Sequence, residues 1–245
     1  MLATRGTRTS TRLGVLGLAA VAMTLLSGCG VVSFGTQKTA SASVPSVAAS
    51  ATGSGSTAPS APSAPATGGT VTGAQAQILA ALPKRPATAK AWTLAQDPTA
   101  VGLLTPQQFI LADYTAAAQA SELGIQKERG LQYAARQNWF DQATGIYVDT
   151  FVIHYSTASG AQSDYLILLK GDSKKYDAQG SYTVPGIAQS KVFVKAKLDS
   201  YGNSMSLGLA VVGDNVLRTL MLNPAAPDHA TLTGLLTGEY KALGQ

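Results

Sequence analysis

The chain has 245 residues, of which 45% are hydrophobic and 13% charged, and its formal net charge is +5. This balance excludes a highly charged disordered chain, a coiled coil and a collagen-like fibre. Three of the positive charges, Arg5, Arg8 and Arg12, lie at the N-terminus with no acidic residue near them. Beyond residue 72 the chain holds 14 basic and 13 acidic residues. We therefore expect no nucleic-acid partner, because such binding needs a clustered basic surface.

The N-terminus has the order of a secretory signal. A cationic segment over residues 1–12 precedes an apolar run over residues 13–26, and small residues follow. This order is typical of a signal peptide. The apolar run is shorter than the roughly 20 residues that span a bilayer as a helix. We expect residues 1–28 to be a signal peptide that is removed.

Cys29 is the only cysteine in the chain and directly follows Leu26-Ser27-Gly28. An exported protein with one cysteine forms no internal disulfide. The four residues resemble the lipobox of bacterial lipoproteins, in which the cysteine becomes the first residue and carries diacylglycerol. The resemblance implies a lipoprotein anchored at the cell membrane by acyl chains such as palmitate, facing outside the cytoplasm. Two chains anchor a protein stably. The alternative is a plain secretory signal with an incidental cysteine.

Residues 29–72 have a different composition from the rest of the chain. Ser, Ala, Thr, Gly and Pro dominate this segment, where Lys38 is the only charged residue and Phe34 the only aromatic one. Such a segment buries too little apolar surface to offset the entropy of ordering, so we predict a disordered linker. Residues 73–245 have the size of a single extracytoplasmic domain with its own core.

Hydrophobic periodicity and turn residues predict the elements of this domain in chain order. A helix is expected to start at Thr105-Pro106-Gln107-Gln108, which has the residues of a capping box. The last helix is expected to open at Pro227-Asp228. These signals predict an α+β fold, in which a mainly antiparallel sheet of about five strands is covered by helices in the order α-β-β-α-β-β-β-α. The predicted ranges are helix 105–123, strands 127–140 and 146–155, helix 156–170, strands 191–198, 204–212 and 215–223, and a helix from 227.

The element order over residues 103–243 resembles the PsbP-like domains of actinobacterial lipoproteins. The resemblance rests on Phe151, Ala161 and Tyr165, on Val184-Pro185-Gly186-Ile187 and on the last hairpin. It implies a non-enzymatic lipoprotein that binds or helps assemble something at the cell envelope. A shared fold does not define a function.

Catalytic and metal-binding patterns are sparse. His154 and His229 are the only histidines, and neither has further ligands at the spacing of a metal site. The domain contains no Gly-x-Ser-x-Gly, Ser-x-x-Lys or Cys/His pattern. Asp149 and Asp164 could form an acid/base pair only if folding brought them together. We therefore expect no metal and no cofactor, and His154 is interpreted as a packing residue.

One surface patch is a candidate ligand site. Lysines at alternate positions share strand parity with an aromatic residue, and two tyrosines lie in neighbouring loops. Such a patch could bind an anionic polymer or lipid headgroup through charge and stacking. The alternative is an edge strand whose lysines prevent aggregation. The residues are Lys191, Phe193, Lys195, Lys197, Tyr182 and Tyr201.

Three functions are consistent with the sequence. The first is a lipid-anchored, non-catalytic binding or accessory domain whose partner is an envelope polymer, a lipid or a protein. The second is a cell-envelope hydrolase or transferase whose site is assembled from scattered polar residues. The third is a lipid or glycolipid carrier with a large apolar cavity between sheet and helix.

Overall fold

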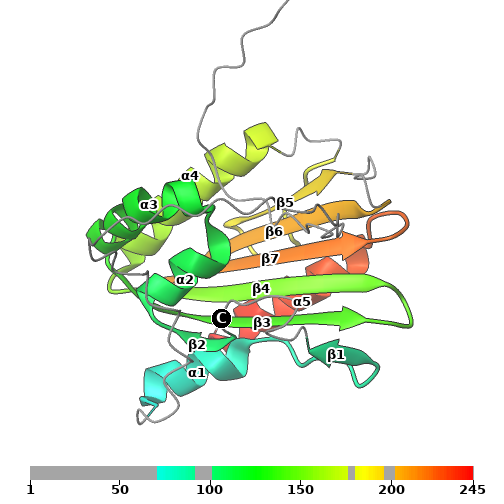
Figure 1. Cartoon of the computed structure of the whole chain (residues 1–245), viewed down its shortest axis with the longest axis horizontal. Helices are drawn as coiled ribbons and strands as arrows, with labels where there is room; N and C mark the ends of the chain where they lie inside the picture. Colours follow the sequence, from blue (N-terminus) through cyan, green and yellow to red (C-terminus); the bar gives the residue numbers. More distant parts are fainter. Residues whose placement is uncertain (1–70, 92–100, 176–179, 196–201, 245) are drawn as a thin grey trace, which may run out of the picture.

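The computed structural model describes residues 71–91, 101–175, 180–195 and 202–244 (Figure 1). Within these ranges the chain forms five helices and seven strands. The helices are α1 (Gly73–Ala81), α2 (Pro106–Asp113), α3 (Ala116–Glu128), α4 (Ala158–Lys175) and α5 (His229–Ala242). The strands are β1 (Ala89–Ala91), β2 (Gly102–Leu104), β3 (Leu131–Asp141), β4 (Ile146–Tyr155), β5 (Ser190–Lys195), β6 (Ser204–Val212) and β7 (Asn215–Asn223).

The strands form one antiparallel sheet in the order β1-β3-β4-β7-β6-β5, and β2 also pairs with β3. β1 and β2 lie along different parts of β3, so they share one edge of the sheet, and β5 forms the other edge. β4 and β7 occupy the centre. The expected α+β class and mainly antiparallel sheet are confirmed.

Each face of the sheet carries its own hydrophobic core. Successive side chains of a strand point to opposite faces, and β4 shows this directly. Phe151 and Ile153 pack in one core with residues of α2 and α4, whereas Val148 and Val152 pack in the other with residues of α1 and α5. α2 and α5 accordingly lie on opposite sides of the sheet (Figure 1). The domain therefore has three layers, with the sheet in the middle.

The helix expected over residues 105–123 is two helices. α2 begins at the expected capping box of Thr105 and Gln108. It ends at Asp113 because Tyr114 adopts an extended conformation, with φ −117° and ψ 148°. This conformation places the Tyr114 ring in the core, at an edge-on angle 6.1 Å from Phe109. Thr115 then begins α3, which continues through Gly124 to Glu128.

Three short or weakly amphipathic elements were not expected. α1 begins at Thr72, whose side chain and that of Gln75 form a second capping box. That pattern is present in the sequence and could have predicted the helix. β1 and β2 have three residues each, too few for an alternating pattern to be recognised. A separate difference is the length of α4, which ends at Lys175, five residues beyond the predicted end.

Two glycines of α4 test how closely this helix approaches Arg129, the residue that follows α3. A Cβ on Gly160 would lie 2.1 Å from the Arg129 carbonyl oxygen, whereas a Cβ on Gly171 would contact nothing. We expect Gly160→Ala to lower the free energy of unfolding by about 1–3 kcal/mol. Gly171→Ala should raise it by about 0.5–1 kcal/mol through helix propensity. Urea denaturation of both variants checks this, and a stabilising Gly160→Ala would contradict the close approach.

Candidate functional site

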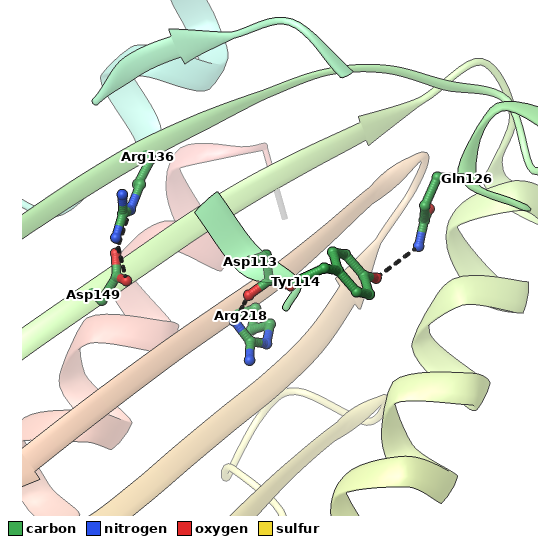
Figure 2. Close-up of polar contacts among 6 residues, drawn as sticks. All are labelled: Asp113, Tyr114, Gln126, Arg136, Asp149 and Arg218. Atoms are coloured by element: carbon green, nitrogen blue, oxygen red, sulfur yellow. Dashed lines mark hydrogen bonds and ion pairs between the residues drawn. The ribbon is translucent and has the colours of Figure 1, made fainter. Parts of the chain in front are cut away.

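A cluster of buried charges lies on the face of the sheet that α2 covers (Figure 2). Arg136 of β3 and Asp149 of β4 form a bidentate ion pair, with Nε–Oδ1 and Nη2–Oδ2 distances of 2.8 and 2.7 Å. Arg136 is 1% exposed and its guanidinium lies 5.2 Å from the centre of the Phe151 ring. Burial raises the pKa of Asp149, and the hydrogen bonds and charge of Arg136 oppose that rise.

A second ion pair lies beside the first. Arg218 of β7 contacts Asp113, the last residue of α2, through Nη1 and Oδ1. Its charge also acts on Asp149. The positive charges of the two arginines balance the negative charges of the two carboxylates, so the cluster presents no net charge to a ligand. Because Asp113 belongs to α2, its ion pair with Arg218 stabilises the position of α2 on the sheet.

A buried glutamine connects the three helices on this face. Gln126 of α3 donates from Nε2 to Tyr114 Oη (3.1 Å) and Asp164 Oδ1 (2.7 Å), and its Oε1 accepts from Tyr155 Oη (2.8 Å). Asp164 is also paired with Arg129 at 2.8 Å. Asp164 therefore belongs to this network, whereas Asp149 is paired with Arg136. The two carboxylates considered as an acid/base pair each have their own arginine.

The opposite face of the sheet contains a buried carboxyl group, that of Glu239 in α5. It is 1% exposed and accepts hydrogen bonds from Thr150 Oγ1 at 2.5 Å and Thr219 Oγ1 at 3.2 Å. Burial raises the pKa of Glu239 to about 8, although both hydrogen bonds lower it. The carboxyl group is therefore protonated at neutral pH. It connects α5 to the two central strands.

A half-open cleft lies on the same face, between α1 and the turn that joins β6 to β7. Its volume is about 230 Å³. The described residues that line it come from α1, β4, the turn and the C-terminal end of the domain: Ala74, Gln77, Ile78, His154, Val212, Gly213, Asp214, Asn215 and Leu243. The turn needs a glycine at position 213, where φ is +58°. Segments far apart in the sequence thus build one polar site.

Hydrogen bonds hold the polar side chains of this cleft in place. Asn215 contacts His154 Nδ1 at 3.0 Å and Asp214 Oδ1 at 2.8 Å. His154 Nδ1 lies 3.5 Å from Asp214 Oδ1, and the His154 ring packs 4.6 Å from that of Tyr133. His154 does pack as expected from the sequence, but it also lines the cleft. Convergent polar groups in a concave surface are typical of binding sites, so this cleft is the candidate functional site.

The predicted lysine patch differs from the surface that the structure describes. Phe193 is 1% exposed and packs in the core beneath α4, so the expectation that it could stack on a ligand is wrong. Lys195 is exposed and Lys191 half-buried. β5 is an edge strand, which is the position assumed by the alternative interpretation of the lysines.

The tyrosines of the patch do not join the lysines in one described site. Tyr182 packs against the face opposite to Phe193, where its ring stacks on that of His229 at 5.2 Å and its hydroxyl contacts Thr233. Cys29, Lys197 and Tyr201 lie outside the described residues. The ligand-binding role of the lysines stays a prediction.

No protein-family model matches the chain, and no curated protein matches it. Within the described ranges no helix is long and apolar enough to cross a membrane. In the same ranges no group of three or more His, Cys, Asp or Glu side chains could hold a metal ion. Among solved structures, the chain is similar to the extracellular domain of PknH from Mycobacterium tuberculosis, with a TM-score of 0.41 and 11% identity over 69% of this chain and 95% of that one.

Proposed function

We propose that the protein is a lipid-anchored binding domain on the outer side of the cell membrane, and that its ligand occupies the cleft at His154. The observation that carries the binding role is the composition of this cleft. His154, Asp214 and Asn215 converge in it, and none of its described lining residues has a hydroxyl or thiol group. Such a site can orient a ligand through hydrogen bonds, and its described residues include no Ser, Thr or Cys nucleophile.

The anchor is supported by the lipobox-like residues before Cys29 and by the linker that follows. α1 begins at Gly73, directly after the linker, and contributes Ala74, Gln77 and Ile78 to the cleft. The cleft thus lies at the end of the domain where the linker enters. A linker of about 43 residues that behaves as its composition predicts would span roughly 33–39 Å as a flexible coil, which would give the cleft access to ligands near the membrane.

The two other functions have less support. A hydrolase with two facing carboxylates would need Asp149 and Asp164 together, but each is buried in its own cluster. A lipid carrier would need an apolar cavity between sheet and helices, where two clusters of buried side chains pack instead. The resemblance to PsbP-like domains stays a prediction.

Replacing Cys29 tests the anchor. In a host that processes lipoproteins, we expect Cys29→Ser to move the protein from the membrane fraction to the soluble or secreted fraction, because the diacylglyceryl group needs the thiol. Immunoblots of fractionated cells measure this shift, with Ser27→Ala as the matched control. Unchanged membrane retention of Cys29→Ser would contradict the lipid anchor.

A further inference from the structure

The hydrogen bonds of the cleft define which of its atoms donate and which accept. Asn215 Nδ2 lies 2.8 Å from Asp214 Oδ1 and 3.4 Å from the Val212 carbonyl oxygen. Both of these partners can only accept, so the amide nitrogen must face them. Asn215 Oδ1 therefore faces His154 Nδ1 at 3.0 Å. Because the amide oxygen only accepts, Nδ1 carries the hydrogen.

This assignment leaves two acceptors for a ligand. In neutral His154 with a hydrogen on Nδ1, the other ring nitrogen, Nε2, is an acceptor. Asp214 Oδ2 accepts as well, and the Asp214 side chain is 43% exposed. Within the described part of the chain neither atom has a hydrogen-bond partner. No lysine or arginine is among the described lining residues, so Asp214 gives the cleft a net negative charge.

The remainder of the cleft is largely apolar and small. Of its aliphatic lining residues, Ile78 and Val212 are nearly buried and Leu243 is half-buried. The volume of about 230 Å³ lies below the roughly 300–1,000 Å³ that encloses a whole drug-sized ligand. The cleft therefore suits one side-chain-sized group with a polar end and an aliphatic arm.

Extending the proposed function, on which this inference rests, we propose that the cleft binds a primary ammonium group on an aliphatic arm, such as a lysine side chain on a peptide. An ammonium group supplies three donors, which can bond to His154 Nε2 and Asp214 Oδ2, and it carries the charge opposite to that of Asp214. A hydroxyl group could bond to the same acceptors but would leave the carboxylate charge unmatched. Four methylenes can cover Ile78, Val212 and Leu243, whereas an ethanolamine headgroup supplies only two.

A titration with small amines tests this assignment. The probe is n-pentylamine, added at neutral pH to the lipidated full chain in an uncharged detergent and followed by NMR of the amides of Gly213, Asp214 and Asn215. We expect these signals to shift with a Kd of about millimolar, as the few atoms of the probe allow. Pentan-1-ol, which has the same arm and no charge, should bind at least tenfold more weakly.

The Asp214→Asn variant tests whether the charge of Asp214 is needed to bind the ammonium group. It keeps the acceptor for Asn215 Nδ2 but removes the charge, and we expect it to weaken pentylamine binding about 10- to 100-fold. Glu128→Gln removes the same charge at an exposed position of α3 and should leave the affinity unchanged.

The possible outcomes separate the inference from the proposed function. Equal binding of pentan-1-ol and pentylamine would overturn the ammonium assignment and leave a binding cleft. Tighter binding of ethanolamine would overturn the lysine-type arm and indicate a lipid headgroup. The absence of any shift at the turn would also overturn the inference. The binding role in the proposed function fails separately, if the protein isolated from its host carries no bound ligand.

Discussion

Replacing Arg136 with methionine is expected to lower the free energy of unfolding by about 3–5 kcal/mol. The guanidinium and the Asp149 carboxylate are both nearly buried and joined by two hydrogen bonds. Methionine fills much of the same volume but leaves Asp149 as a buried charge without its bidentate partner. Most of the lost free energy of unfolding is therefore the cost of keeping the Asp149 carboxylate buried without Arg136. Urea or guanidinium denaturation of the variant measures it.

The double variant Arg136→Met/Asp149→Leu distinguishes this cause from poor packing. Replacing both members of a buried ion pair with apolar residues is often neutral or stabilising, so we expect most of the lost stability to return. Arg129→Met is the matched control, because the Arg129 side chain is 15% exposed and its partner Asp164 keeps Gln126. A double variant as unstable as Arg136→Met alone would contradict the assignment.

The second large effect is the pH dependence due to Glu239. Its pKa is raised to about 8 from a usual value of 4.5, so between these values the folded protein binds a proton that the unfolded chain has released. The contribution of Glu239 to stability is therefore complete below about pH 4.5 and is lost as pH rises to about 8. At about 1.4 kcal/mol per pH unit, the loss is on the order of 5 kcal/mol.

Glu239→Gln should remove this dependence, since glutamine stays neutral and keeps an acceptor for Thr150. We expect the variant to match the native protein near pH 5 and to exceed its stability by several kcal/mol at pH 8.5. Denaturant unfolding at both pH values measures the difference, and Glu128→Gln controls for the loss of an exposed carboxylate. A difference that is the same at both pH values would contradict a protonated, buried Glu239.

Prediction from the sequence was most accurate for the strands whose hydrophobic pattern and turn residues agree with their packing in the folded domain. The predicted strands 204–212 and 215–223 match β6 and β7. These strands carry apolar residues on both faces and are joined by a turn with glycine at position 213, so both signals are strong. The prediction of one helix over residues 105–123 was wrong because its periodicity continues across Tyr114. There the burial of a single ring outweighs helix propensity.

The candidate site could be predicted only in part. The strands predicted on either side of Asp214 are present and His154 was placed correctly on a strand, but no local signal indicates that α1 packs beside them. β5 shows the same limit. Its lysines are predicted to lie on the same face of the strand as Phe193. The sequence alone could not show that α4 covers this face, so that Phe193 is buried. In both cases the missing information is which helix covers which face of the sheet.

Native mass spectrometry tests the central claim most directly, namely a lipid-anchored domain that binds a ligand in the cleft. The native protein and its Asp214→Asn variant would be isolated from host membranes in mild detergent and measured by native mass spectrometry. We predict a chain that begins at Cys29 with the mass of a diacylglyceryl group, and a bound ligand that Asp214→Asn loses. A chain without acyl mass, or an identical set of bound species in both proteins, would contradict the claim.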